Sequence, residues 1–280
     1  MRRGAHVEQV HRGVWRITST PRSFDFDVRA GILALPDDAV LSHVSALRWL
    51  GVEVGATRPV HFTTTRINQT RESIVLHRRV GRVHPRVVHG VTVLGPDRSF
   101  VDSATLLSIR SLVRAGDALV RRGETTSDRL LRYVNDCHLD GVVRARRAAM
   151  LVRNRVDSFR ETDLRLILVL TGLPEPETNV EVLADDGTWL ARGDLVLPEF
   201  RVVVEHDGWH HERDADQRQK DHFRRERLEA ARWTLIVVTQ ADFDHPIAIV
   251  ARVHEALRRN GYQGPPPHLG REWHFIVRNM

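Results

Sequence analysis

Two consecutive apolar segments, each carrying one acidic residue, constrain the fold of this chain more than any other feature. The first segment, residues 190–197, contains Asp194, and the second, residues 201–206, contains Glu205. Only residues 198–200 separate them. Short apolar segments joined by so tight a turn predict two neighbouring antiparallel strands. We therefore expect the two carboxylates to lie side by side on one sheet.

The segments around these strands predict an α/β arrangement with a mixed sheet. A helix is expected over 158–170, because Ser158 is followed three residues later by Glu161 in a capping-box pattern. Further expected elements are a strand at 179–183, a polar helix at 214–231, an apolar strand at 234–239 and a helix at 246–259. The tail from residue 261 contains three consecutive prolines and is expected to be extended.

The first half of the chain predicts an α+β domain that ends in helices. A short strand or one arm of a hairpin is expected over residues 8–18 around Gly13, and Ser42 is a suitable N-cap for one of the helices. The expected helices are 24–35, 42–50, a helix that begins at 97 or 99 and ends at 107, 110–121, 126–135 and 140–152. The expected strands are 59–65, 73–78 and 88–94. We place the domains at 1–153 and 154–260, followed by the tail 261–280. Three tryptophans in apolar patterns, Trp15, Trp49 and Trp233, are expected in the core.

The cysteine count and the hydropathy exclude several classes of protein. Cys137 is the only cysteine, which excludes a disulfide framework and a cysteine-based zinc site. The N-terminus lacks the apolar core of a signal peptide, and no run of 18 apolar residues occurs. We therefore expect a soluble cytoplasmic protein without a membrane partner.

The charge balance favours a polyanionic partner. The chain has 42 basic and 36 acidic residues, a net charge of +6, and Lys220 is its only lysine. Arginine richness is typical of proteins from GC-rich genomes, which is sufficient to explain the composition. An excess of guanidinium groups also attracts phosphate, so DNA is the partner that we expect.

The paired carboxylates point to a divalent cation. Two like charges beside each other on a sheet are costly unless a cation lies between them or one is protonated. Mg²⁺ or Mn²⁺ prefers hard oxygen ligands, which Asp194, Glu205 and the main-chain carbonyl of His206 could supply. A cation held there could activate water and stabilise a phosphodiester under attack.

A run of polar residues follows the second strand. It contains Glu205-His206-Asp207-Gly208-Trp209-His210-His211, and then Gln217, Lys220, Asp221 and Arg224. Each of these residues taken alone is typical of a solvated surface, and their combination carries the signal. Zinc bound by His206, His210, His211 and Glu212 is an alternative. Adjacent histidines point apart on most backbones, so the hard-cation site is the preferred interpretation.

Residues 158–245 resemble the DUF559 family of Vsr-like domains in the PD-(D/E)XK restriction-endonuclease-like superfamily. The family pattern is an acidic residue on one strand, a second strand ending E-x-D-G-x-x-H, and then D-x-x-R-x-x-x-L. Asp194, the segment 205–211 and the segment 221–228 match it in that order, and Glu161 matches a glutamate on the helix before the sheet. The resemblance implies a restriction-endonuclease-like mixed sheet with flanking helices.

The resemblance also implies roles for individual residues. Asp194 and Glu205 would bind the metal, and His211 and Asp207 would lie beside it. Asp207 stands where the superfamily has a lysine, so Lys220 would supply the ammonium, with Arg224 and Gln217 on the DNA. Two further departures are Arg232, where the family commonly has glycine, and Val237, where it often has arginine.

The N-terminal half resembles the corresponding region of AbiEi-type antitoxins. The matching segments are 10–15, 42–47, 90–93 and 98–102. Relatives carry a winged helix before the first segment; here we expect only its wing, without the recognition helix.

Two functions follow from these patterns. The first is a metal-dependent DNA endonuclease with Asp194, Glu205, Asp207, His211, Glu161 and Lys220 as its catalytic set. The second is a non-catalytic DNA-binding regulator of the antitoxin type. A homodimer is compatible with both functions, and a toxin partner belongs to the second only. The paired acids favour the nuclease, because carboxylates repel phosphate and a protein that only binds DNA has no need of them.

Overall fold

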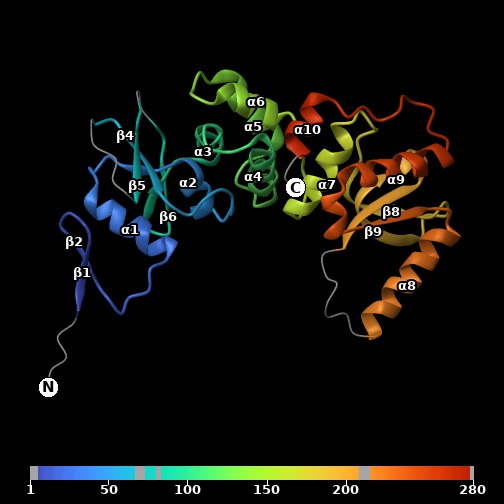
Figure 1. Ribbon diagram of the computed structural model, residues 1–280, viewed down its shortest axis with the longest axis horizontal. Helices are drawn as coiled ribbons and strands as arrows, with labels where there is room; N and C mark the ends of the chain where they lie inside the picture. Colours follow the sequence, from blue (N-terminus) through green and yellow to red (C-terminus); the bar gives the residue numbers. More distant parts are fainter. Residues whose placement is uncertain (1–5, 67–72, 80–82, 208–214, 278–280) are drawn as a thin grey trace. The chain divides into compact units, whose positions relative to one another are not determined.

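A computed structural model describes residues 6–66, 73–79, 83–207 and 215–277 (Figure 1). The chain forms two compact units, the first made of Met1–Ala115 and Asp128–Ala149, the second of Gly116–Ser127 and Met150–Met280. The domain boundary expected after residue 153 lies near Met150, where the main segment of the second unit begins. Among the described residues, none of the helices combines the length and apolarity that crossing a membrane requires.

The first unit contains a hairpin and a five-stranded sheet. The hairpin consists of β1 (Val7–His11) and β2 (Val14–Ile17), and the sheet has the order β5-β4-β3-β7-β6. The sheet strands are β3 (Val40–Leu41), β4 (Val60–Thr64), β5 (Ile74–Arg78), β6 (Arg86–Val88) and β7 (Val91–Val93). The helices are α1 (Phe24–Ala34), α2 (His43–Trp49), α3 (Pro96–Ser103), α4 (Ile109–Arg121), which continues into the second unit, α5 (Ser127–Asp136) and α6 (Val142–Ala149). Apolar residues of α1, α2 and this sheet form the core, which includes Val28, Leu41 and Phe62.

Three expectations for the first unit need correction. Strand β3 was not expected, because two residues are too few to show a periodic pattern. The strand expected at 88–94 is instead two antiparallel strands, β6 and β7, which turn at Gly90 with a φ of 75°. Trp15 is 60% exposed, whereas Trp49 packs against the core. A two-stranded hairpin has two faces and only one of them is covered, so the alternation that predicted the strand did not tell which face is buried.

The second unit is built on a mixed sheet, which confirms the α/β prediction. Its strands are β8 (Glu177–Leu183), β9 (Trp189–Leu197), β10 (Val202–Asp207) and β11 (Thr234–Thr239), in the order β11-β10-β9-β8. Strand β9 is antiparallel to both β8 and β10, and β11 is parallel to β10. The helices are α7 (Phe159–Val169), α8 (Ala215–Ala230), α9 (Pro246–Arg259) and α10 (Arg271–Val277), with short 3₁₀ turns η1 (Pro198–Phe200) and η2 (Ala241–Asp244).

The sheet of the second unit buries both faces. Leu195, Val204 and Ile236 belong to one core, together with apolar residues of α7, α9 and α10. Val196 and Val203 belong to a second core with Leu228 of α8. Successive residues of a strand point to opposite faces, so α8 covers the face opposite to α7 and α9, as Figure 1 shows. This arrangement determines which polar residues of the strands lie beneath α8.

The C-terminal tail differs from the extended segment that we expected. Residues 271–277 form α10, and Trp273 is 3% exposed within the core of the second unit. The indole Nε1 of Trp273 donates a hydrogen bond of 2.9 Å to the carbonyl oxygen of Ile167 on α7. The three prolines at 265–267 led us to predict an extended tail, whereas the apolar residues after them form a short helix that packs on the core.

A buried ion pair joins α7 to the C-terminal part of α4 within the second unit. Nη2 of Arg165 lies 3.0 Å from Oδ2 of Asp117, and both side chains are almost fully buried. The hydroxyl of Thr162 and the main-chain N–H of Arg153 also donate to Asp117. Burial of a guanidinium is costly without a partner, so this carboxylate fixes α7, the helix that begins beside Glu161.

Side chains cover part of the outer edge of β11. The guanidinium of Arg252 on α9 donates a hydrogen bond of 2.6 Å to the carbonyl oxygen of Val237. The carboxylate of Asp242 accepts a hydrogen bond of 2.6 Å from the main-chain N–H of Thr239. These main-chain groups of the edge strand are therefore satisfied within the chain.

Candidate active site

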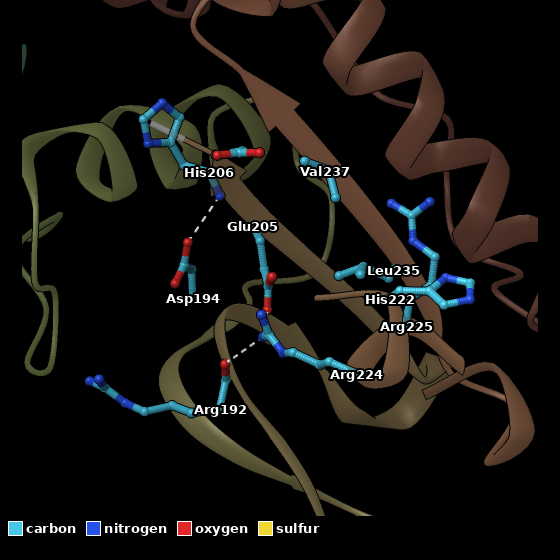
Figure 2. Close-up of a pocket in the computed structure, with 10 residues that line it drawn as sticks. Arg192, Asp194, Glu205, His206, His222, Arg224, Arg225, Leu235 and Val237 are labelled. Carbon is cyan, nitrogen blue, oxygen red and sulfur yellow. Dashed lines mark hydrogen bonds and ion pairs between the residues drawn. The ribbon is translucent and has the colours of Figure 1, made fainter. Parts of the chain in front are cut away.

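A polar pocket of about 430 Å³ lies between the sheet of the second unit and α8 (Figure 2). Strands β9, β10 and β11 form its floor, and α8 contributes charged side chains. The lining residues are Arg192, Asp194, Glu205, His206, Asp207, His222, Arg224, Arg225, Leu235 and Val237. The pocket therefore gathers Asp194, Glu205, Asp207 and Arg224, all of which the sequence analysis selected.

The strand register explains why the acids converge. Val203 pairs with Val196 and Val204 pairs with Leu195, so the next pair along this antiparallel ladder is Glu205 and Asp194. Val196 and Val203 face α8, and residues two positions away on each strand face the same side. The expected placement of the two carboxylates on one face is confirmed.

Asp194 lies in a half-buried environment. Its Oδ2 accepts a hydrogen bond of 2.9 Å from the main-chain N–H of His206. Burial raises the pKa of Asp194, the hydrogen bond from His206 opposes that rise, and the nearby charge of Glu161 adds to it. A cation beside Asp194 would therefore favour its ionised form and lower its pKa.

Glu205 forms an ion pair with Arg224. The Nη2 atom of Arg224 contacts Oε1 of Glu205 and also donates a hydrogen bond of 2.9 Å to the carbonyl oxygen of Arg192 (Figure 2). The side chain of Glu205 is 13% exposed and that of Arg224 is 29% exposed. Arg224, which we expected to contact DNA, is thus paired with Glu205, which we expected to bind the metal.

Glu161 lies at the start of α7 and does not line the pocket. The Ser158 hydroxyl accepts a hydrogen bond from the Glu161 N–H, as the capping-box pattern predicted. The Glu161 carboxylate accepts hydrogen bonds from the side-chain amide of Asn179 (2.5 Å) and the N–H of Asp157 (2.8 Å). Glu161 therefore acts on Asp194 through its charge.

His206 also lines the pocket, but its ring packs toward the opposite face of the sheet. Its ring lies edge-on against Phe243, with 5.5 Å between the ring centroids. Burial lowers the pKa of His206, and the charge of Arg160 lowers it further. Within the described ranges, no group of three or more His, Cys, Asp or Glu side chains is arranged to hold a metal. The other residues of the zinc alternative, His210, His211 and Glu212, lie outside the described residues.

The other residues that we predicted for the site have side chains that the structure does not describe. His211 is outside the described residues, and Gln217 and Lys220 lie on α8 with side chains outside that description. Sequence reasoning did not select Arg192 or His222. Arg192 precedes Asp194 by two residues on β9, so the strand period was the signal that would have placed it on this face.

The two departures from the family pattern have structural consequences. Arg232 follows the end of α8 with a φ of 60°, in the left-handed region where glycine is favoured. Its main-chain N–H still bonds to the carbonyl oxygen of Glu229, so the arginine preserves the helix end. Val237 lines the pocket, so the position that often carries arginine in the family contributes an apolar wall here.

The pocket has the donor set of a hard-cation site. The carboxylates of Asp194 and Glu205 are oxygen ligands of the kind that Mg²⁺ and Mn²⁺ prefer. Asp207 lines the same pocket but does not complete a three-residue metal group with them among the described residues. The pKa of Asp194 is raised and Glu205 is paired with a guanidinium, so a positive charge placed beside these two carboxylates would stabilise their ionised forms. The residues therefore fit a divalent cation, which would compete with Arg224 for Glu205.

A second cluster of titratable side chains lies in the first unit, and sequence reasoning missed it. The rings of His43 and His77 stack with 3.7 Å between centroids, and Nδ1 of His61 lies 2.9 Å from Nε2 of His77. Burial lowers the pKa of His43 to about 2 and that of His61 to about 4. His43 has a φ of 53°, in the left-handed region. The three rings are far apart in the sequence, on α2, β4 and β5, so only the fold brings them together.

The chain is similar to two uncharacterized proteins from strains of Mycobacterium tuberculosis. Each is 25% identical to it over 190 residues, which cover 66% of this chain and 69% of the relative. No model of a known protein family matches the chain, and no solved structure matches it. The function must therefore be argued from the pocket itself.

Proposed function

We propose that this protein is a metal-dependent DNA endonuclease that hydrolyses phosphodiester bonds in the pocket beneath α8. The observation that carries the proposal is the convergence of Asp194, Glu205, Asp207 and Arg224 from three separate elements. Asp194 and Glu205 would hold Mg²⁺ or Mn²⁺, which when bound can activate water and stabilise charge on a phosphate. Their order along the chain is that of the PD-(D/E)XK-like pattern, which supports the same proposal.

The chain's own residues have distinct tasks in this proposal. Arg192 and Arg224 bring positive charge to a pocket floored by acids, which allows a phosphate to approach. Asp207 follows Glu205 by two residues and lines the same wall, where its carboxylate can accept a proton from water. The charge of Glu161 raises the pKa of Asp194. The roles of His211, Lys220 and Gln217 remain those that the sequence pattern implies.

DNA is the substrate class that the charges favour. The chain carries a net charge of +6, and three arginines line the pocket. Guanidinium groups bind phosphate through paired N–H donors, without regard to base sequence. The attraction should therefore weaken steeply as salt is added.

The proposal is tested by a cleavage assay on plasmid and oligonucleotide substrates with Mg²⁺ or Mn²⁺. The substrates should include duplex, single-stranded, mismatched and modified DNA. The wild type should cut at least one of them, and Asp194→Ala should abolish cutting while DNA binding without metal persists. Glu199→Ala removes an equal charge from an exposed position outside the pocket and should cut normally. A wild type that cuts none of these substrates would refute the nuclease.

A non-catalytic DNA-binding regulator of the antitoxin type is the second candidate. The ion pair of Glu205 with Arg224 favours it, because this pairing already neutralises one acid without a metal. If the protein is such a regulator, the wild type and Asp194→Ala should shift DNA equally in a gel-mobility assay, and neither should cut it.

A further inference from the structure

The guanidinium of Arg224 stands at the position that a cation would take beside Glu205. A single nitrogen, Nη2, contacts the carboxylate of Glu205 and the main-chain carbonyl oxygen of Arg192. A carboxylate and a main-chain carbonyl are the kinds of oxygen that Mg²⁺ and Mn²⁺ bind. The positively charged side chain of Arg224 therefore occupies two oxygen atoms that could otherwise bind a cation.

We propose that Arg224 is an internal competitor for the divalent cation, and that the site accepts a cation readily only when Arg224 moves to another anion. This inference rests on the proposed function, because the cation and the anion are those of the nuclease. It assigns to Arg224 control over metal uptake, in addition to phosphate contact.

The position of Arg224 permits such an exchange. It projects from α8 across the pocket rather than from the strand that carries Glu205, and its side chain is 29% exposed. A long side chain with a partly exposed head can change partners without moving the backbone. Asp194 instead accepts a main-chain hydrogen bond from β10 and stays fixed on its strand. The movable part of the site is therefore the arginine.

A DNA phosphate is the anion that would release Glu205. Guanidinium binds phosphate with two parallel N–H donors, so the exchange replaces one charge-assisted contact with another. Once Arg224 has moved, its guanidinium no longer competes with a cation for Glu205. By linkage, phosphate binding then raises cation affinity and cation binding raises phosphate affinity by the same factor. The pocket would thus be primed by its substrate.

The competition is tested by titrating Mn²⁺ into the full-length protein without DNA, using isothermal calorimetry. Arg224→Gln should bind Mn²⁺ on the order of tenfold more tightly than the wild type, because the internal cation is gone. Arg225→Gln is the matched control, since it removes the same charge from the same pocket and the same helix. Its affinity should stay within about threefold of the wild type.

Two results would overturn the inference. One is an Arg224→Gln variant that binds Mn²⁺ no more tightly than the wild type, and the other is an equal gain in Arg225→Gln, which would reveal a general charge effect. If Arg224→Gln does not fold by circular dichroism, Arg224→Met decides. Methionine is an unbranched side chain of similar helix propensity that carries no charge, so the Mn²⁺ affinity of Arg224→Met should exceed that of the wild type. An unchanged affinity in Arg224→Met would then refute the competition.

The same measurements separate this inference from the proposed function. If Arg224→Gln gains Mn²⁺ affinity but the wild type cuts no DNA, the competition stands and the nuclease is refuted. If the wild type cuts DNA and Arg224→Gln gains no affinity, the nuclease stands and the competition is refuted.

Discussion

Acid should destabilise the first unit through its buried imidazoles. His43 and His61 are each 7% exposed, and their pKa values in the folded protein are about 2 and about 4, against 6.5 for an ordinary exposed histidine. Burial is the largest cause in both, and the charge of His77 adds to it. Both folded-state values are lowered, so below 6.5 the unfolded chain binds protons that the folded chain does not. The stabilising contribution is therefore complete above pH 6.5, and it is lost as the pH falls toward about 4 for His61 and toward about 2 for His43.

The size of the effect follows from linkage. At about pH 5, each of the two histidines should cost about 2 kcal/mol of unfolding free energy relative to about pH 8. His43→Asn removes one of these titrations, and asparagine tolerates the left-handed backbone of that position. The variant should therefore lose about 2 kcal/mol less than the wild type between the two pH values.

Urea denaturation at the two pH values, followed by circular dichroism, measures this difference. His138→Asn is the matched control, because His138 belongs to the same unit and is exposed. It should lose as much stability on acidification as the wild type. Equal acid losses in the wild type and His43→Asn would refute the idea that the stacked imidazoles are held neutral by the fold.

Three further substitutions test the packing of the second unit, each by urea denaturation. Gly193→Ala should cost about 1–3 kcal/mol, because its Cβ would lie 2.6 and 2.8 Å from two buried valine methyls. Asp117→Asn should cost about 3 kcal/mol, because it removes the buried carboxylate 3.0 Å from the guanidinium of Arg165 and leaves only the more distant Glu175, at 3.9 Å, as an acidic partner. Trp273→Ala should also cost about 3–5 kcal/mol, because a cavity opens and the bond to Ile167 is lost. A change below about 0.5 kcal/mol in any of them would contradict the packing described.

Local signals predicted the parts of the site that local structure determines. The capping residues Ser158 and Glu161 form the predicted contact at the start of α7. The alternating pattern placed Asp194 and Glu205 on neighbouring strands, and the ladder between β9 and β10 confirms this. These features depend on residues close in the sequence, so spacing alone was sufficient to find them.

Features that depend on how elements pack could not be found in this way. The bond between Arg224 and Glu205 exists because α8 lies across the sheet, and no spacing rule gives the position of a helix over a strand. The burial of Trp273 depends on a contact with a helix about a hundred residues earlier in the chain. For Trp15, the strand was predicted correctly, but the side chain is exposed and not in the core as we expected.

The covered edge of β11 has a consequence for association between chains. An uncapped edge strand offers main-chain donors and acceptors to any extended segment, and aggregation and strand exchange begin at such edges. Here Arg252 and Asp242 already bond to main-chain groups of β11, so an incoming strand would have to break both contacts before it could pair. We therefore expect this apolar strand to resist adding a partner strand, and Arg252→Ala to make the protein more prone to aggregate on mild heating.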